Sequence, residues 1–433
     1  MILRLSDSLS RGLLIAAALL VGLWLSFFGI RSAVANYYSE IGTAQSLESA
    51  VRLEPENSAY WYMLGRYQQY NLEQPDSAQA EKSYLKAIAL NPDATDAWLD
   101  LGTAYELDGK TEQARDAYLK AKKSYPASAD VSWRYGNFLL RQGEQPEAYV
   151  EMRRAIEADP HRAAAAFSRA YRSNPNIDEL LDQLLPPKQS VYVDVIWEAL
   201  SARQLAVAKT VWGRLLTIHP APQLEMREVD YFIAVLLQEG EFNEARQVWE
   251  QGTATMKLPP LLQPQGSVVW DPSFETNVNG NAFSWRYPAM AQGVSIGLDK
   301  NTKLSGNQSL RLAFDGKHNP NLESPCTTAV VQPSTTYRFS GWIKTQAITS
   351  DQGIGFRLRS VEDNTAPLVD TAKIRATNPW VFVDQTWSSG PNVHRVQICI
   401  TRDASENPDT RISGTAWIDD VNLFPQAAEH RKP

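Results

Sequence analysis

Hydrophobic residues change their pattern twice along the 433-residue chain. Residues 13–30 form an uninterrupted apolar run, residues 36–258 carry small and aromatic positions at the spacing of paired helices, and beyond residue 266 apolar and polar positions alternate. A chain of this length is too long for one compact domain. The patterns therefore predict a multidomain α plus β protein, with an N-terminal transmembrane helix, an α-helical repeat array and a C-terminal antiparallel β-sandwich.

The apolar run 13–30 reads LLIAAALLVGLWLSFFGI and contains no charged residue. As a helix it would rise about 27 Å, close to the thickness of one hydrocarbon core. Arg4 and Arg11 precede it, which favours a cytoplasmic N-terminus over residues 1–12 and an extracytoplasmic location, periplasmic or cell-envelope, for the bulk of the chain. Arg31 on the far side weakens this orientation without reversing it. We expect a single-pass membrane anchor.

Two alternatives to an anchor stay open. Ala33-Val34-Ala35 has the small-x-small form that signal peptidase reads, which would make the segment a cleaved signal peptide. Against this, the apolar run exceeds the usual ~7–15 residues, and Arg31 separates it from the candidate cleavage site. The other alternative is a buried core helix. Anchor and signal peptide both export everything after residue 35.

A 34-residue period organises the next region. Pro92, Pro126 and Pro160 stand 34 residues apart, and Pro55 precedes Pro92 by 37. Weaker copies flank the good ones at 39–55, 192–220 and 226–256, whereas residues 161–190 lack the Gly and Pro positions. Each good copy places small residues in both helices, with aromatic or long side chains between them: Trp61, Gly65, Ala80, Tyr84, Ala87; Trp98, Gly102, Ala114, Tyr118, Ala121; and Tyr135, Gly136, Ala148, Met152, Ala155.

These positions resemble the tetratricopeptide repeat, which the middle copy matches at nearly every marked position. The resemblance implies an α-superhelix over residues 36–258 whose concave face binds protein segments. The alternative is that the side chains on this face are solvated or packed against a neighbouring element. They lack the Lys/Asn pattern with which such repeats hold a terminal carboxylate, so that ligand is not expected. The side chains expected to face inward include hot-spot types, and they are Tyr62, Arg66, Tyr70, Thr103, Glu106, Trp133, Asn137 and Arg141.

The helical pattern ends near residue 258. The stretch LPPLLQPQG, which ends at residue 266, has three prolines and a glycine and indicates a linker over residues 259–266. Beyond it, four runs alternate apolar and polar residues between turn residues, as in an all-β sandwich. These runs are 309–314, 337–343, 355–359 and 396–400.

Five short motifs follow one another in this region, each weak alone: DPSFE at 271–275, FSW at 283–285, SGNQSL at 305–310, YRFSGWIK at 337–344 and WIDDVNL at 417–423. Their order resembles jelly-roll carbohydrate-binding modules and their galactose-binding-like relatives over residues 267–425. The resemblance implies a two-sheet jelly roll, followed by a tail over residues 426–433. Such modules stack aromatic rings on sugar faces, but many have lost sugar binding and serve as protein contacts.

For carbohydrate binding, the resemblance points to Tyr287, Trp380 and Trp387 as candidate stacking residues, with Phe382 on the same side of its strand as Trp380. Three other tryptophans occupy positions that are core in this family, namely Trp285, Trp342 and Trp417.

The same resemblance implies a structural calcium. Glu275 and Asp420 match the positions that would supply carboxylates, with backbone carbonyls near Ser305 adding to the ~six to eight oxygens that calcium needs. The alternatives are that Glu275 caps a turn and that Asp420 pairs with an arginine.

The chain has two cysteines, Cys326 and Cys399. If this region is exported, a disulfide is the simpler expectation. The alternative is a pair of buried free thiols, because sequence alone does not show that two Cβ atoms meet.

The sequence shows no catalytic constellation. Its five histidines are scattered, and there is no phosphate loop or dinucleotide fingerprint. Asp419 and Asp420 are neighbours on a predicted strand and so point to opposite faces, which prevents them from acting as a paired acid and base. The net charge of −7 argues against a nucleic-acid partner. We expect no enzyme and no cofactor apart from the calcium.

These observations favour a membrane-anchored envelope scaffold. The repeats would bind a protein partner and the sandwich would contact polysaccharide, for example during assembly or export of an exopolysaccharide. The alternative is a pure protein–protein adaptor whose β-sandwich has no sugar affinity.

Overall fold

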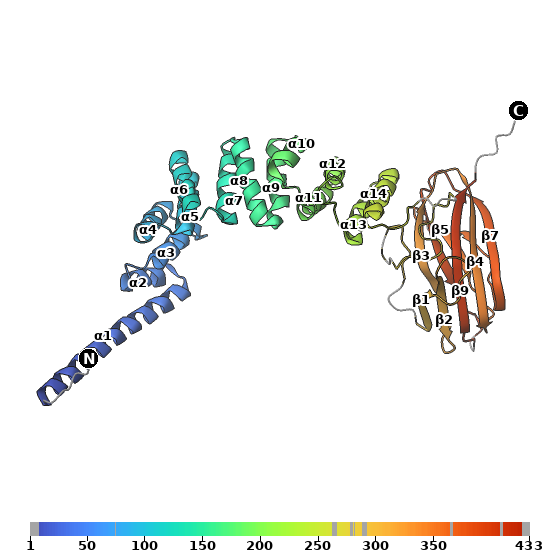
Figure 1. The fold of residues 1–433 in the computed structure, drawn as a ribbon, viewed down its shortest axis with the longest axis horizontal. Coiled ribbons are helices and arrows are strands. Elements are labelled where there is room, and N and C mark those ends of the chain that lie inside the picture. The colour runs from blue at the N-terminus through green and yellow to red at the C-terminus, as the bar shows by residue number, and fades with distance from the viewer. Residues whose placement is uncertain are drawn as a thin grey trace. The chain divides into compact units, whose positions relative to one another are not determined.

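The computed structural model describes residues 8–73, 75–261, 266–277, 280, 282–287, 292–363, 367–407 and 410–426. Residues 1–7, half of the predicted linker and nearly all of the predicted tail lie outside this range. The chain forms helices followed by antiparallel strands, which confirms the expected fold class (Figure 1). It divides into two compact units, Met1–Val195 and Ile196–Pro433.

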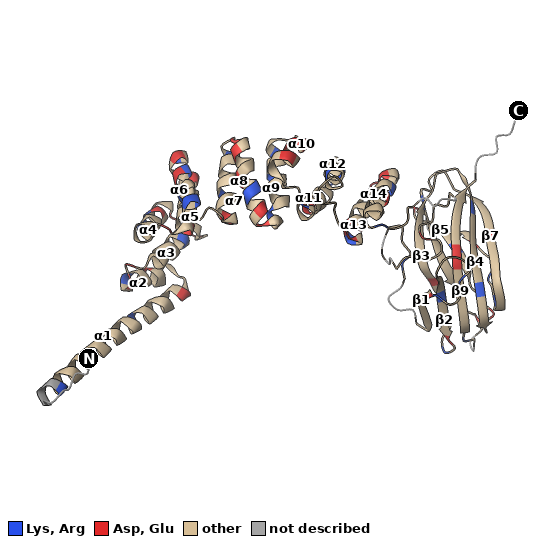
Figure 2. Ribbon diagram, viewed as in Figure 1, with Lys and Arg blue, Asp and Glu red and all other residues tan. Residues whose placement is uncertain are grey.

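The first helix, α1 (Ser8–Ile41), is long and apolar enough to cross a membrane. Figure 2 shows how few charges it carries along its length. The helix does not end at residue 30 but continues into the repeat region. Near its end Ala35 is fully buried in one cluster with Leu47 and Ala50 of the next helix. The last turns of α1 therefore act as the first helix of a hairpin.

Paired helices make up the rest of the first unit, in the order that the 34-residue period predicts. Asn57, Asp76 and Ser128 each begin a helix by accepting a backbone N–H bond with the side chain. The helices are α2 (Ala44–Leu53), α3 (Ser58–Tyr70), α4 (Ser77–Leu90), α5 (Thr95–Leu107), α6 (Thr111–Ser124), α7 (Ala129–Arg141), α8 (Gln145–Ala158), η1 (Pro160–Arg162), α9 (Ala163–Ser173), α10 (Ile177–Glu179), the π-helical turn η2 (Leu180–Leu184) and α11 (Gln189–Ser201).

A tryptophan links consecutive hairpins by the same contact in two repeats. Trp61 Nε1 donates to the carbonyl of Pro55 at 2.9 Å, and Trp98 Nε1 donates to the carbonyl of Pro92 at 2.8 Å. Each proline follows the end of a helix, where the last carbonyls lack a partner within the helix. The Trp and Pro positions of the period therefore form one contact that fixes how each hairpin follows the one before.

Glycine allows the two helices of a hairpin to approach closely. A Cβ at Gly65 would lie 2.7 Å from the ring of Tyr84, and one at Gly136 would lie 2.9 Å from Met152 Cγ. Tyr84 is itself fully buried and donates its hydroxyl to Gln69 at 2.6 Å. The two helices α3 and α4 cannot separate without losing the contact between Gly65 and the Tyr84 ring.

The second unit contains the last helices and two antiparallel sheets. The five-stranded sheet has the order β1-β2-β9-β4-β7 and the four-stranded sheet has the order β3-β8-β5-β6. Its elements are α12 (Leu205–Leu215), α13 (Met226–Gln238), α14 (Phe242–Thr255), β1 (Val294–Asp299), β2 (Ser309–Asp315), β3 (Leu322–Val330), β4 (Thr336–Ile348), β5 (Gly355–Ser360), β6 (Pro367–Asp370), β7 (Ala376–Ser388), β8 (Arg395–Arg402) and β9 (Ser413–Pro425).

The sandwich core lies between the two sheets. Alternate residues of β4 point inward, and Phe339 meets Phe356 of β5 with ring centroids 5.1 Å apart. Gly341 of β4 leaves room for the Phe356 ring, because a Cβ at residue 341 would lie 2.8 Å from that ring. Cys326 and Cys399 face each other on β3 and β8 and are joined by a disulfide.

The hairpin of α13 and α14 packs directly on the sandwich. The Trp249 ring meets the rings of Trp270 and Phe283, with centroids 5.2 and 5.4 Å away. Phe242 stacks on His394 at 4.8 Å. The boundary between the compact units consequently falls within α11 rather than at the predicted linker over residues 259–266.

We expect Gly65→Ala to destabilise the α3–α4 hairpin by about 1–3 kcal/mol through overpacking. Alanine favours a helix over glycine by about 1 kcal/mol, so propensity alone predicts the opposite sign. Gly213→Ala in α12 is the matched control, because a Cβ there meets nothing within 4 Å. Hydrogen exchange of the full chain measures each helix locally. Slower exchange in α3 and α4 of Gly65→Ala would contradict the packing explanation.

Candidate functional site

A buried carboxylate joins three helices on one face of the repeats. Asp100 of α5 is 1% exposed. Its carboxylate accepts hydrogen bonds from the hydroxyls of Tyr62 at 3.0 Å and Tyr70 at 3.4 Å, both on α3. Arg134 of α7 reaches it at 2.5 Å, and Arg66 of α3 lies 3.6 Å away. Asp100 therefore orients side chains from the two repeats on either side of its own.

The two tyrosines act as neutral donors in this group. Burial, reinforced by the charge of Asp100, raises the pKa of Tyr62 and the pKa of Tyr70. Their hydroxyls consequently keep their protons at physiological pH. Tyr70 nevertheless leaves 47% of its surface exposed, so its ring is available to a ligand.

A second carboxylate lies one to two turns further along α5. Glu106 receives a bidentate hydrogen bond from Arg141 of α7, at 2.5 and 2.8 Å. The Tyr118 hydroxyl lies 3.3 Å from the same carboxylate and 3.2 Å from the Thr103 hydroxyl. Burial raises the pKa of Tyr118 to about 12. Both carboxylates of this face thus hold an arginine of the following repeat.

Trp133 and Arg169 lie beside these pairs. The Arg169 guanidinium of α9 lies over the Trp133 ring, 4.7 Å from its centroid, and donates to Asn137 Oδ1. Asn137 is itself held by a 2.7 Å bond to the Trp133 carbonyl. Burial, with repulsion from Arg141 and Arg172, lowers the pKa of Arg169.

Together these side chains line a hollow of about 210 Å³, which we call the repeat groove. Its lining residues are Tyr70, Thr103, Tyr118, Trp133, Arg134, Asn137, Arg141 and Arg169.

The sequence predicted much of this face but missed its centre. Tyr70, Thr103, Trp133, Asn137 and Arg141 line the groove as expected. Tyr62 and Arg66 instead contact Asp100, and Glu106 contacts Arg141.

Asp100, Arg134 and Arg169 were not predicted. A signal for Asp100 exists in the chain, because it stands between Leu99 and Leu101, both buried. A carboxylate among buried residues of a helix needs a partner.

On the sandwich, the predicted stacking role of Trp387 is wrong, whereas Tyr287 is only partly buried. Trp387 is 8% exposed and stacks on Tyr337 within the core, with ring centroids 5.6 Å apart. Tyr287 packs against the same core, and burial raises its pKa. The Trp387 ring therefore fills the interior and offers no face to a sugar. Trp285 is buried in the core as expected.

Partly exposed aromatic rings lie instead on the outer face of the five-stranded sheet. Trp342 of β4 is directly opposite Phe382 of β7, with ring centroids 4.9 Å apart. Phe382 is 42% exposed, and Arg338 lies over it at 5.7 Å. Trp380 lies two residues before Phe382 on β7, beside a register shift between β4 and β7. We call Trp342, Trp380 and Phe382 the aromatic strip. Trp342 was expected in the core, but odd-numbered residues of β4 point inward, so Trp342 points outward.

The residues predicted for calcium form hydrogen bonds with neighbouring groups, and calcium binding by them stays a prediction. Glu275 accepts N–H bonds from the backbone of Asn307 at 2.8 Å and from its side chain at 2.9 Å. Asp420 accepts from the Asn422 side chain at 2.9 Å. Near Ser305 the backbone N–H groups of Leu304 and Ser305 donate to Asp419. Within the described residues no group of three or more His, Cys, Asp or Glu side chains could hold a metal.

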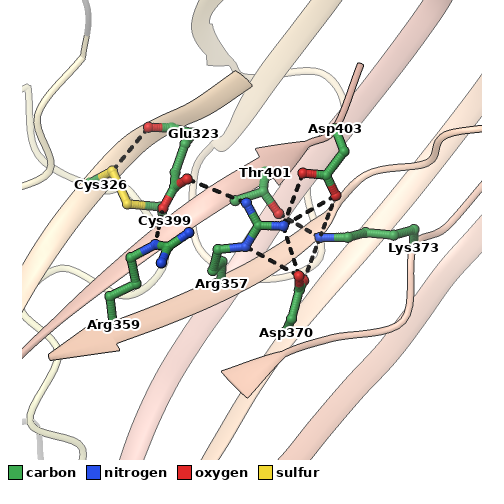
Figure 3. Close-up of polar contacts among 9 residues, drawn as sticks. All are labelled: Glu323, Cys326, Arg357, Arg359, Asp370, Lys373, Cys399, Thr401 and Asp403. Atoms are coloured by element: carbon green, nitrogen blue, oxygen red, sulfur yellow. Dashed lines mark hydrogen bonds and ion pairs between the residues drawn. A yellow bond between two sulfur atoms is a disulfide. The ribbon is translucent and has the colours of Figure 1, made fainter. Parts of the chain in front are cut away.

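Charged side chains also gather on the four-stranded sheet, next to the disulfide (Figure 3). Arg357 of β5 is bonded to Asp370 at 2.7 Å, to Asp403 at 2.9 Å and to Glu323 at 3.3 Å. Lys373 bonds Asp370 at 2.7 Å. Each carboxylate of this cluster has a cation within reach, and together they tie β3, β5 and β6 with the ends of β8.

Comparison with known proteins supports the repeats. The tetratricopeptide repeat family model matches residues 70–129 and 109–163. The type IV pilus assembly protein PilF of Pseudomonas aeruginosa is 25% identical over 182 residues, covering 41% of this chain and 60% of that protein. This chain therefore spans less than two thirds of that relative. Tetratricopeptide repeats are protein-interaction scaffolds, and the match implies such a scaffold here.

Solved structures resemble each part of the chain at low similarity. YrrB, described as a repeat protein with an unusual peptide-binding site, is 14% identical with a TM-score of 0.27, covering 50% of this chain and 94% of that one. The CBM22-1 xylan-binding domain of Paenibacillus barcinonensis Xyn10C is 18% identical with a TM-score of 0.26, covering 36% and 93%.

We expect the charge cluster to make the sandwich sensitive to acid. Burial alone would raise the pKa of Asp370, but hydrogen bonds from Lys373 and Arg357 outweigh it and the pKa lies below its usual value. A carboxyl whose pKa falls on folding stabilises the fold above its unfolded pKa, near ~3.9, and this contribution is lost as the pH falls through the folded value.

The test is hydrogen exchange of β5 and β6 in urea between pH 6 and pH 2. In Asp370→Asn, the protection of β5 and β6 should fall less steeply below about pH 4 than in the wild type. Lys373→Met should reduce the steepness in part. An unchanged pH profile in Asp370→Asn would show that this carboxyl does not carry the effect.

Proposed function

We propose that this protein is a non-catalytic, membrane-anchored scaffold of the cell envelope. Its repeat groove binds a protein partner, and its sandwich contacts polysaccharide, for example during assembly or export of a surface glycan. One observation carries the proposal: the Asp100 carboxylate holds Tyr62, Tyr70 and Arg134 in fixed positions on one face of the repeats.

The groove has the composition of a binding hot spot. Tyrosine, tryptophan and arginine dominate its lining, and these residues are enriched where partners bind tightly. Their side chains are already ordered by Asp100, Glu106 and Asn137. Binding therefore costs less side-chain entropy than at a mobile surface.

Two features support an envelope location. The apolar helix α1 carries Arg11 on its N-terminal side, which favours a cytoplasmic N-terminus and export of the rest. The disulfide between Cys326 and Cys399 suits an oxidising compartment. The pilus-assembly relative is in keeping with this location.

The aromatic strip supports polysaccharide contact. Trp342, Trp380 and Phe382 carry their rings on β4 and β7, beside the cation of Arg338. Rings of this kind stack on the apolar faces of sugars. The alternative role is a pure protein–protein adaptor, in which the same strip contacts a protein.

The charge cluster of the four-stranded sheet supports a non-catalytic role. Glu323, Asp370 and Asp403 are each neutralised by a cation. Such pairing lowers a carboxylate's basicity and occupies the oxygens that an acid–base catalyst would need free.

Trp133→Ala tests the groove. The full-length protein is used in detergent to capture partners from the membranes of its source, after cross-linking, with quantitative mass spectrometry. Loss of a hot-spot ring typically costs about 2 kcal/mol or more, or roughly thirtyfold. We expect the recovery of groove partners to fall accordingly.

Tyr125→Ala is the matched control, since Tyr125 is 56% exposed and is not among the residues lining the groove. Circular dichroism shows whether each variant is folded. Equal recovery by wild type and Trp133→Ala would remove the groove as the binding surface.

Trp380→Ala combined with Phe382→Ala tests the strip. We expect the full chain to bind at least one polysaccharide on a glycan array, and the double variant to bind it about tenfold more weakly, since each ring contact contributes ~0.5–1.5 kcal/mol. Val361→Ala is the control, because Val361 is 39% exposed and follows β5 of the other sheet. If the wild-type protein retains no glycan, the adaptor alternative holds and polysaccharide contact is excluded.

A further inference from the structure

Arg169 differs from the other arginines of the repeat groove in its partners. Arg134 is paired with Asp100, and Arg141 with Glu106. Arg169 bonds only the neutral amide of Asn137, and among the described residues no carboxylate lies within ion-pair distance of it. Its positive charge is therefore not neutralised within this part of the chain.

Neighbouring cations make this charge costly. Partial burial, followed by repulsion from Arg141 and Arg172, lowers the pKa of Arg169, whose side chain is still exposed to solvent. Arg172 bonds only a backbone carbonyl, that of Ser168 at 3.1 Å. Because neighbouring cations repel Arg169 in the free protein, binding of an anion there relieves unfavourable electrostatic energy. The ligand that fits the charge of Arg169 is an anionic group, here a carboxylate.

The geometry presents Arg169 as a receptor rather than a mobile surface charge. Its guanidinium rests on the Trp133 ring at 4.7 Å, and Asn137, which is 5% exposed, holds one edge. The guanidinium has five N–H donors in a planar fork, so donors remain for a bidentate bond to a carboxylate. Both Trp133 and Arg169 line the hollow of about 210 Å³.

We propose that Arg169 selects the occupant of the repeat groove by binding an Asp or Glu side chain of an acidic protein segment. This inference rests on the proposed protein-binding function of the groove and adds the chemistry of the partner. A protein segment is favoured over an anionic polysaccharide because the tetratricopeptide match covers the helices α5, α6 and α7 of the groove. Tyr70, which is 47% exposed, also offers its ring to a neighbouring side chain of a peptide.

The experiment displays random twelve-residue peptides against the full-length protein in detergent. Pools are sequenced for wild type, Arg169→Gln, Arg169→Lys and Trp133→Ala. We expect peptides that depend on Trp133 to be enriched at least tenfold in Asp or Glu at one position. Arg169→Gln should abolish that enrichment, and Arg169→Lys, which keeps the charge without the planar fork, should retain part of it.

Arg52→Gln is the matched control. Arg52 of α2 is exposed, bonds a single neutral side chain, that of Ser49, and lies outside the groove. Its removal changes the net charge by the same amount and should leave the enrichment intact.

The remaining outcomes separate this inference from the proposed function. Peptides that depend on Trp133 but show no acidic preference, or the same preference in Arg169→Gln, would overturn the role of Arg169 while leaving the groove a protein site. If no peptide depends on Trp133, both ideas fail. Retention of polygalacturonate through Arg169, without any acidic peptide, would show that the anion belongs to a polysaccharide and would overturn the inference.

Discussion

Close approach of paired helices at glycine is the constraint on which the repeats depend. At Gly65 and Gly136 the second helix of a hairpin lies so near that a Cβ would meet Tyr84 or Met152 at less than 3 Å. Because the hairpins are this thin and repeat every 34 residues, the first helices of successive repeats present the same face side by side. Asp100 can then be reached from α3 and α7 at once. The groove is a consequence of the packing.

Polar contacts between repeats give that face a second role. Asp100 and Glu106 each hold an arginine of the next repeat, so the same bonds connect adjacent repeats and orient side chains toward a ligand. Such fully paired groups are stable only together, since removing one partner leaves a buried charge uncompensated. Arg169 ends this series without a carboxylate. The arginines of this face therefore differ in their partners. Arg134 and Arg141 are paired with carboxylates and connect repeats, whereas Arg169 has no carboxylate partner among the described residues.

The sandwich carries its stabilising contacts and its aromatic strip on different faces. Inward residues of β4 and β5 form the core, and the four-stranded sheet is further tied by the disulfide and the cluster around Arg357. The outer face of the five-stranded sheet carries the aromatic strip instead. Packing of Trp249 against Trp270 joins the last hairpin to the sandwich. The sequence places a proline-rich linker between helices and strands, but the linker does not separate compact units.

Periodicity in the chain was sufficient for the architecture. The 34-residue spacing of Pro92, Pro126 and Pro160 specified the hairpins, and the alternation around Tyr337 specified the strands, because helix and strand each repeat side chains at a fixed local period. The same period identified Tyr70, Trp133 and Arg141 on one face. Tertiary structure decided everything that depends on contacts between distant segments. The register of β4 with β7 placed Trp342 outside and Trp387 inside. The turn at Asn307 brought a backbone N–H group to the carboxylate of Glu275, 32 positions earlier in the chain. Asp100 gained its role from residues more than 30 positions away in both directions, a relation that no local pattern contains.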